Sequence, residues 1–230
     1  MLIQDKQQRD WKTIIKKFEA VLGKNGVVQR REELITYECD GLTSYRQRPA
    51  VVVLPRTTEQ VAEVVKICDR HNIPFIARGS GTGLSGGALP IEDCVLIVTS
   101  MMRQVLSVDL ENQQVVVQPG VINNWVTQAV SGDGFYYAPD PSSQIICSVG
   151  GNVAENSGGV HCLKYGVTTN HVLGLKVVTP DGSIVDLGGQ VPEMPGYDLT
   201  GVFVGSEGTL GIATEITLRI LKSAESICVL

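Results

Sequence analysis

A glycine-rich segment, RGSGTGLSGG at residues 78–87, is the feature that most restricts how this chain can fold. Five of its ten residues are glycine, and Gly81, Gly83 and Gly86 complete a G-x-G-x-x-G pattern. That pattern indicates a Rossmann dinucleotide site only where a strand precedes it and a helix opens directly from it. The apolar run IPFIA predicts the strand, but a further glycine and Pro90 follow too closely for such a helix. We therefore reject the Rossmann interpretation, and a nicotinamide-binding domain stays only as an alternative.

The glycines still predict a turn that binds a ligand. Without Cβ atoms the backbone can adopt positive φ and come close to a bound molecule, and successive N–H groups form a site for an anion. A plain structural turn does not need so many residues that lose conformational entropy on folding. The lack of a G-K-[ST] ending argues against a P-loop. We expect a phosphate-bearing ligand at this segment.

The composition limits the possible partners. The 230 residues include 43% hydrophobic side chains, enough for one or two packed cores, and carry a net charge of −5. Because no apolar window approaches ~18 residues and the first residues are polar, we expect neither a membrane span nor a secretory signal. The acidic balance gives nucleic acid no broad basic face. These features predict a soluble, cytoplasmic protein.

Six cysteines are scattered along the chain without any C-x-x-C pair. Such a distribution is typical of reduced, mostly buried thiols in the cytoplasm. Cys162 beside His161 is an adjacent pair, and we interpret it as a coincidence. No metal site is predicted, neither zinc nor an iron–sulfur cluster held by this chain alone.

Apolar periodicity in the first half of the chain predicts a small α/β unit. Residues 7–22 repeat apolar side chains at helical spacing, and Gly23 follows as a stop. Thr57 and Gln60 predict a capping box at the start of a second helix. The apolar face of that helix consists of Val61, Val64, Val65 and Cys68. Three continuously apolar runs, typical of strands covered on both faces, lie at 50–54, 73–77 and 95–99.

From about residue 105 onward, apolar and polar residues alternate, which is typical of antiparallel hairpins. Two hairpins are predicted, at 105–120 and 174–188. A final strand at 211–221 is expected to place Ile212, Ile216, Leu218 and Ile220 on one face. The predicted fold class is therefore α+β, with a small parallel α/β subdomain at 1–104 and a mostly antiparallel sheet with helices at 105–222.

Three loops of the second half contain further unusual segments. They are YAPDPSSQ at 137–144, SVGGNVAENSGGVHCLKYG at 148–166 and GYDLTGVFVGSEGTLGI at 196–212. Each one alone also suits a turn, a helix start or a place where elements cross. Together with the first glycine segment, and spread over two subdomains, they favour one long ligand lying between them, and a dinucleotide has that length.

Polar side chains in these loops suit such a ligand. Ser142 and Ser143 follow prolines that fix the backbone, and their hydroxyls can donate to phosphate or ribose oxygens. Asn152 and Asn156 carry amides that can pair with the edge of a planar ring offering both donors and acceptors. An isoalloxazine has such an edge.

Three long motifs carry a family resemblance. RGSGTGLSGGALP, PDPSSQIICSVGGNVAENSGGVHCLKYG and GSEGTLGI together resemble the FAD-binding domain of the vanillyl-alcohol oxidase and p-cresol methylhydroxylase superfamily. Within it, the chain is most similar to the flavin subunits of bacterial glycolate oxidases, and YECDGLTSYRQRP supports this. The resemblance extends from about residue 30 to residue 222, and its motifs are far more specific than one G-x-G-x-x-G pattern.

The resemblance implies FAD held between the two subdomains, with the first glycine loop around the pyrophosphate and the GSEGTLG segment near the adenosine half. Some relatives attach the flavin through a histidine in the first glycine loop, which this chain lacks, so we expect noncovalent FAD. The implied cofactor-binding residues are Arg78, Gly79, Ser80, Gly81, Thr82, Gly83, Gly86, Gly87, Pro139, Asp140, Ser142, Ser143, Gly150, Gly151, Asn152, Asn156, Gly158, Gly159, Glu207, Thr209 and Ile212.

The resemblance also implies a second, substrate-binding cap of comparable length after this domain. In the family that cap carries the histidine base and the arginines that hold the substrate carboxylate, and we expect residues 223–230 to begin it. No catalytic residue is therefore assigned. His161, Lys164 and Arg46 are expected to be structural or to contact the edge of the flavin.

For the complete enzyme the resemblance implies oxidation of a 2-hydroxy acid, foremost glycolate to glyoxylate, by hydride transfer to N5 of FAD. A D-lactate or D-2-hydroxyglutarate dehydrogenase of the same family and a noncatalytic FAD-fold scaffold subunit are the alternatives. The implied partners are an iron–sulfur subunit and a second flavin-like subunit. Through them a cytoplasmic protein can associate with a membrane.

Overall fold

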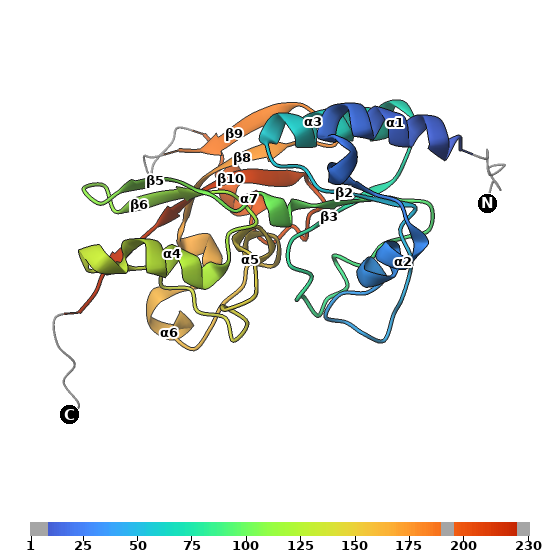
Figure 1. Ribbon diagram of the computed structural model, residues 1–230. Helices are drawn as coiled ribbons and strands as arrows, with labels where there is room; N and C mark the ends of the chain where they lie inside the picture. Colours follow the sequence, from blue (N-terminus) through green and yellow to red (C-terminus); the bar gives the residue numbers. More distant parts are fainter. Residues whose placement is uncertain (1–8, 190–195, 225–230) are drawn as a thin grey trace.

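The three continuously apolar runs of the first half form parallel strands, in a computed structural model that describes residues 9–189 and 196–224. These strands belong to a four-stranded sheet with the order β1-β2-β4-β3, in which β1 is antiparallel to β2. The strands are β1 (Val27–Val28), β2 (Val51–Val53), β3 (Phe75–Arg78) and β4 (Val95–Val98). This sheet confirms the predicted α/β unit, which lies beside a second sheet (Figure 1).

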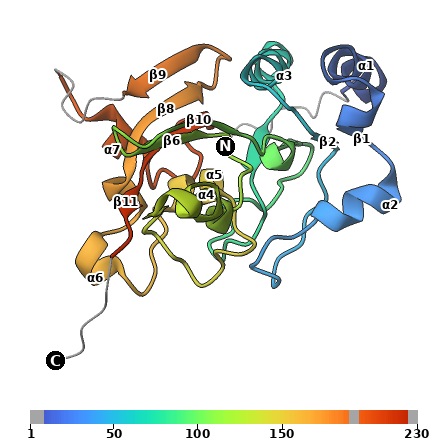
Figure 2. The same cartoon turned by 60° about the vertical axis from the view of Figure 1, so that its left-hand side comes forward.

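Helices cover both faces of the first sheet, which explains why its strands are continuously apolar. α1 (Trp11–Leu22) and α3 (Thr58–Arg70) lie side by side over one face (Figure 2). Val51 and Val53 pack under them, whereas Val52 packs on the opposite face with Leu34 of α2 (Arg31–Leu34). Alternate residues of one strand thus enter different cores, and all of them are removed from water.

Both predicted helices of the first half are confirmed, with two differences in detail. α1 begins at Trp11, and residues 7–8 of the predicted helix lie outside the described residues. The Thr57 side chain caps α3 by accepting from the backbone N–H of Gln60. The Gln60 amide, however, accepts from the N–H of Arg56 at 2.8 Å. The predicted capping box is therefore wrong in its second half, because the return bond reaches one residue further back.

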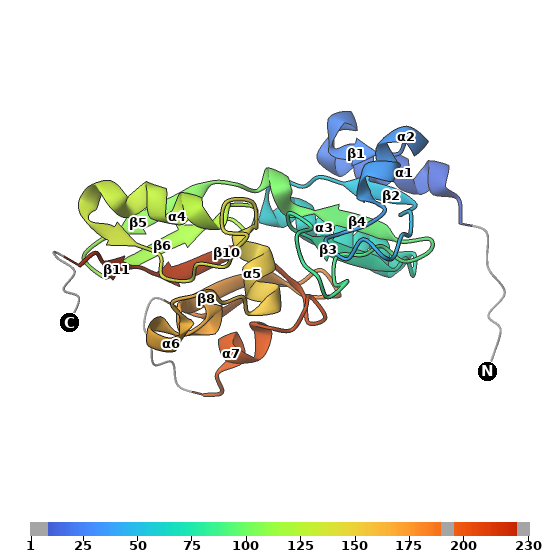
Figure 3. The same ribbon diagram turned by 90° about the horizontal axis from the view of Figure 1, so that it is seen from below.

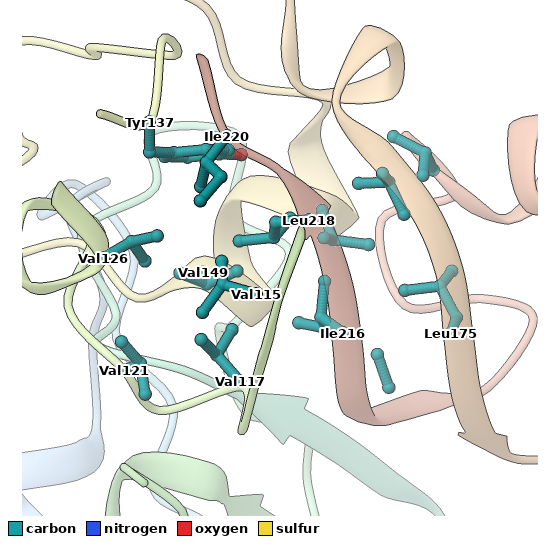
Figure 4. Close-up of a cluster of buried hydrophobic side chains, with 14 of the residues drawn as sticks. Val115, Val117, Val121, Val126, Tyr137, Val149, Leu175, Ile216, Leu218 and Ile220 are labelled. Carbon is teal, nitrogen blue, oxygen red and sulfur yellow. The ribbon is translucent and has the colours of Figure 1, made fainter. Parts of the chain in front are cut away.

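The second sheet is antiparallel throughout and has five strands in the order β5-β6-β10-β8-β9. Its strands are β5 (Val105–Asp109), β6 (Gln114–Val117), β8 (Val172–Val178), β9 (Ile184–Gly188) and β10 (Ile212–Arg219). Both predicted hairpins are confirmed as β5–β6 and β8–β9. α4 (Asn123–Val130) and α5 (Val149–Glu155) contribute Val126 and Val149 to the core on one face of this sheet (Figure 4).

Strand β10 departs from the expected pattern at its first residue. Ile216, Leu218 and Ile220 pack in the core of the second sheet, but Ile212 packs with Val178 in the core beneath α1 and α3. A register irregularity between Ala213 and Glu215 changes the alternation of faces. The prediction of one common face is therefore wrong for Ile212, which instead links the cores of the two sheets.

Short elements complete the second half of the chain. They are β7 (Phe135–Tyr136), which pairs with β11 (Leu221–Lys222), and the helices α6 (Cys162–Tyr165) and α7 (Leu199–Phe203). Among the described residues no helix is long and apolar enough to cross a bilayer. The five cysteines in the same part of the chain are free thiols, while Cys228 lies outside it.

His171, just before β8, is a buried histidine whose environment favours its neutral form. Its Nε2 donates to the carbonyl of Tyr165 at 2.9 Å, while Nδ1 has no partner among the described residues. Burial lowers the pKa of His171 below its ordinary value of 6.5, although the Tyr165 carbonyl partly opposes this shift. Protonation at Nδ1 would place a charge in the interior without an acceptor.

We expect the free energy of unfolding to fall as the pH drops below 6.5, because the unfolded chain then binds a proton that the folded chain excludes. His171→Gln keeps a donor for the Tyr165 carbonyl and should lose less stability than the wild type between about pH 7 and about pH 5. Urea unfolding at several pH values measures this. His71→Gln is the control, and a pH slope in His171→Gln as steep as in this control would contradict the account.

Candidate functional site

A pocket lies at the carboxyl ends of β3 and β4, where the first sheet meets α5 and the second sheet. Its volume is about 170 Å³. Three groups of residues line it, from 77–88, 143–157 and 203–213, together with Thr99 and Pro119. Figure 3 shows α5 at the junction of the two sheets, between the loops that follow β3 and those that precede β10. Segments far apart in the sequence therefore share one pocket, as a long ligand requires.

The first glycine segment follows β3 directly and forms no helix, since residues 79–94 are all described as loop or turn. The rejection of a Rossmann helix is thus confirmed. Gly81 has a φ of +69°, a conformation that residues with a Cβ rarely adopt. A Cβ at this position would also lie 2.3 Å from the guanidinium of Arg78. Glycine is required here both by the backbone and by the side chain packed against it.

Arg78 places a positive charge against this loop. Its Nη1 donates to the carbonyl of Cys39 at 2.7 Å, and its guanidinium lies 6.0 Å from the ring centre of Tyr37. Burial lowers the pKa of Arg78, and the neighbouring Asp40 carboxylate opposes that shift. An arginine nevertheless stays charged at neutral pH. The segment at 37–41 therefore fixes a cation beside the loop predicted to bind an anion.

Helix α5 contacts two of the glycine segments. The hydroxyl of Ser148, just before the helix, accepts from the backbone N–H of Ser80 at 3.2 Å. At the other end of α5, the carbonyls of Val153 and Ala154 accept from the N–H groups of Gly205 and Glu207 at 2.8 and 2.9 Å. The first and the last glycine segments of the chain are thus joined through one short helix.

Most of the predicted site residues line this pocket. They are Arg78, Gly79, Ser80, Gly81, Thr82, Gly83, Gly87, Ser143, Gly150, Gly151, Asn152, Glu207 and Ile212. An adjoining hollow of about 510 Å³ shares Gly87, Glu207 and Ile212 with it and adds Thr209. The residues outside both hollows are Gly86, Pro139, Asp140, Ser142, Asn156, Gly158 and Gly159.

Several residues outside the pocket have structural partners instead. The carboxylate of Asp140 contacts Nδ1 of His161 at 2.6 Å, and a Cβ on Gly159 would lie 2.1 Å from the Asp140 carbonyl. Asn156 ends α5 with a φ of +50°, and its amide oxygen accepts from the N–H of Thr169. These contacts hold the loop that follows α5 against the segment around Asp140.

The three weaker candidates also have partners of their own. His161 bonds to Asp140, Arg46 pairs with Glu38 at 3.0 Å, and the Lys164 ammonium lies 5.0 Å from the ring centre of Tyr165. These side chains do not line the pocket. Whether they are structural or contact the edge of the flavin stays a prediction.

Sequence reasoning missed several pocket residues. Those with polar side chains are Thr99, Ser148, Glu155 and Ser157. Ser148 and Glu155 had an available signal, because both flank the run VGGNVA inside a motif that was already singled out. Thr99 follows β4, and the carboxyl ends of parallel strands meet at one edge of a sheet. That rule would have placed it beside the end of β3.

Comparison with known proteins agrees with this architecture. The FAD binding domain family matches residues 49–188. The chain belongs to this family. The expected resemblance is therefore confirmed, as is the α+β fold with a largely parallel and an antiparallel sheet.

Curated relatives are similar over most of this chain but extend well beyond it. Glycolate oxidase subunit GlcD of Escherichia coli is 51% identical over 195 residues, which is 85% of this chain and 39% of that protein. The same subunit of Bacillus subtilis is 44% identical over 84% of this chain and 41% of its own length. A D-lactate dehydrogenase of Anaerostipes hadrus is 43% identical over 79% and 38%. The chain thus spans about two fifths of these relatives.

Solved structures show the same fold at lower identity. Alkyldihydroxyacetonephosphate synthase superimposes with a TM-score of 0.84 at 23% identity, over 97% of this chain and 43% of that one. A substrate-bound p-cresol methylhydroxylase superimposes with a TM-score of 0.79 at 23% identity, over 95% and 45%.

The pocket has features that suit a flavin nucleotide. Gly208 lines both hollows, and a Cβ there would meet nothing within 4 Å, so bare backbone faces open space. Asn152 is only 3% exposed and lines the first hollow, while its Nδ2 has no partner among the described residues. A buried amide without a partner is costly unless a ligand accepts from it. The residues present therefore fit FAD.

We expect Gly81→Ala to lower the free energy of unfolding by about 2 kcal/mol, because the new methyl group needs a disfavoured φ and displaces the Arg78 guanidinium. Denaturant unfolding measures this loss. Gly132→Ala is the matched control, since a Cβ there would meet nothing within 4 Å. Equal stability of the two variants would contradict both causes, the strain at a positive φ and the contact with Arg78.

Proposed function

We propose that this chain binds FAD noncovalently and forms the flavin domain of a 2-hydroxy-acid dehydrogenase, foremost one that oxidises glycolate to glyoxylate. The observation that carries the proposal is the buried Nδ2 of Asn152, which lacks a partner in the described part of the chain and lies in a pocket bounded by glycine segments. The 51% identity to a glycolate oxidase subunit supports the choice of substrate. Similarity to a D-lactate dehydrogenase keeps D-lactate as the second candidate, with D-2-hydroxyglutarate as a third.

In this proposal the loop at 79–83 surrounds the pyrophosphate through its backbone N–H groups, and Arg78 contributes the nearby positive charge. Glu207, which lines both hollows, and Thr209, which lines the second, are assigned to the adenosine side. The remaining predicted residues outside the hollows are assigned to the walls of the flavin half.

Bound FAD supplies an acceptor for the hydride that leaves the α-carbon of the substrate. The chain's own residues hold and orient the cofactor and exclude water from its buried half. We assign the catalytic base and the carboxylate ligands to a substrate-binding cap that begins at residues 223–230, after subdomains at 1–104 and 105–222. An iron–sulfur subunit and a second flavin-like subunit are the proposed partners, in the cytoplasm or at a membrane through them.

Titration with FAD tests the binding proposal. Purified protein should bind FAD, and Asn152→Leu should weaken the affinity about tenfold, because a buried donor for the ligand is lost. The melting temperature of the unliganded variant should stay close to that of the wild type, since Nδ2 has no partner to lose within residues 9–189 and 196–224. Asn112→Ala, in the β5–β6 turn, is the control. A wild-type protein that does not bind FAD would sink the proposal and favour a scaffold subunit.

Acid precipitation tests how the cofactor is held. We expect all of the yellow colour to move into the supernatant, because the loop at 78–87 offers no histidine for a covalent link. Colour that stays with the precipitated protein would contradict noncovalent binding.

Turnover assays test the division of roles between the domains. This chain alone, loaded with FAD, should reduce a dye with glycolate at a negligible rate, because the groups that orient the substrate and take its proton are assigned to the cap. Glycolate-dependent reduction well above the rate with free FAD would overturn that assignment.

A further inference from the structure

Two bonds connect the first glycine loop to opposite ends of α5. Ser148, just before the helix, accepts from the N–H of Ser80, and Glu155, its last residue, accepts from the hydroxyl of Ser85 at 3.1 Å. We propose that Ser148 and Glu155 are positioning residues that hold this loop (78–88) at a fixed separation from α5 and so set the width of the cofactor pocket. The effect on FAD rests on the proposed function, whereas the effect on the loop does not.

The Ser148 end of α5 is firmly anchored. Ser148 is only 2% exposed, and a Cβ on Gly79 would lie 2.2 Å from its hydroxyl oxygen. The next two backbone N–H groups, of Val149 and Gly150, each donate at 2.8 Å to carbonyls of the turn that follows β6. Movement of Ser148 would therefore break contacts with the second sheet. The loop is attached here to a rigid point.

At the other end of α5, Glu155 supplies a second point of attachment for the loop. Seven helical residues span about 10 Å, so the two bonds lie well apart along α5. One contact would leave the loop free to pivot, whereas two separated contacts also fix its orientation. The other carboxylate oxygen of Glu155 would lie 3.2 Å from a Cβ on Gly87, so the carboxylate also lies close to the end of the loop.

The charge of Glu155 does not explain its place in the pocket. A carboxylate beside a diphosphate repels it, and in water this repulsion lowers the affinity rather than raising it. A favourable contribution of Glu155 must therefore come from the hydrogen bond to Ser85. The variant Glu155→Gln separates the positioning effect from the charge effect, because glutamine keeps a hydrogen-bond acceptor but carries no charge.

Hydrogen exchange of the unliganded protein tests the loop directly. In Glu155→Ala and in Ser85→Ala, amides of 78–88 should exchange about fivefold faster than in the wild type, and the double variant should be no faster than either single one. Glu155→Gln should exchange like the wild type. Ser148→Ala should loosen the first half of the loop. Glu111→Ala, in the β5–β6 turn, is the control and should change nothing in this segment.

Affinity for FAD provides the second measurement. Glu155→Ala and Ser85→Ala should weaken binding about fivefold, whereas Glu155→Gln should bind as tightly as the wild type or more tightly. Exchange in 78–88 that is unchanged in Glu155→Ala would overturn the proposal, as would identical behaviour of the alanine and glutamine variants. If the wild type binds no FAD, the proposed function fails, and the exchange results still decide whether α5 positions the loop.

Discussion

The contact between α5 and the loops around it is the interaction on which the rest of the site depends. A helix of seven residues is too short to be stable alone, so it must be held by packing. Val149 and Val153 supply that packing, because both are fully buried in the core of the second sheet. The antiparallel sheet thereby holds in place the element that carries the glycine segments. Stability of this core and geometry of the pocket are linked for that reason.

The first sheet contributes the wall of the pocket that faces α5, and with Arg78 it contributes the positive charge beside the pocket. Its strands β3 and β4 end side by side, so Arg78 and Thr99 lie at the same edge, and the Thr99 hydroxyl donates to the Arg78 carbonyl at 3.3 Å. The Arg78 guanidinium is held from behind by the carbonyl of Cys39. A half-buried cation fixed in this way attracts an anion without having to move toward it. The Glu155 carboxylate on the opposite wall weakens that attraction, which keeps the local charge balanced.

Sequence patterns were sufficient for the elements that keep one regular pattern of apolar residues along their length. The runs around Val51, Phe75 and Val95 and both hairpins of the second half are of this kind. The patterns failed where tertiary structure changes the local rule. Ile212 lies next to a register irregularity in β10, so its face cannot be read from alternation. The return bond of Gln60 reaches Arg56 because of the local backbone geometry before α3.

The candidate site shows the same division. Most glycines that line the pocket lie in segments that stand out by their glycine content, and the family resemblance implied their role, but Gly208 and Gly211 were not among the predicted site residues. Asp140 and Gly159 belong to sequence segments as unusual as those that line the pocket, yet they pack against each other outside it. Ser148 and Glu155 lie at the two ends of a motif that the sequence does reveal, but nothing in that motif shows which loop they contact. Their importance depends on Ser80 and Ser85, which are 68 and 70 residues away along the chain.

A crystal structure of the protein with FAD tests the central claim most directly. The account predicts one FAD molecule along α5, with its diphosphate against the backbone of 79–83, the Asn152 amide donating to it, and the segment at 205–209 on its adenosine side. An FAD molecule bound elsewhere on the surface, or one that contacts only one of these segments, would contradict the account.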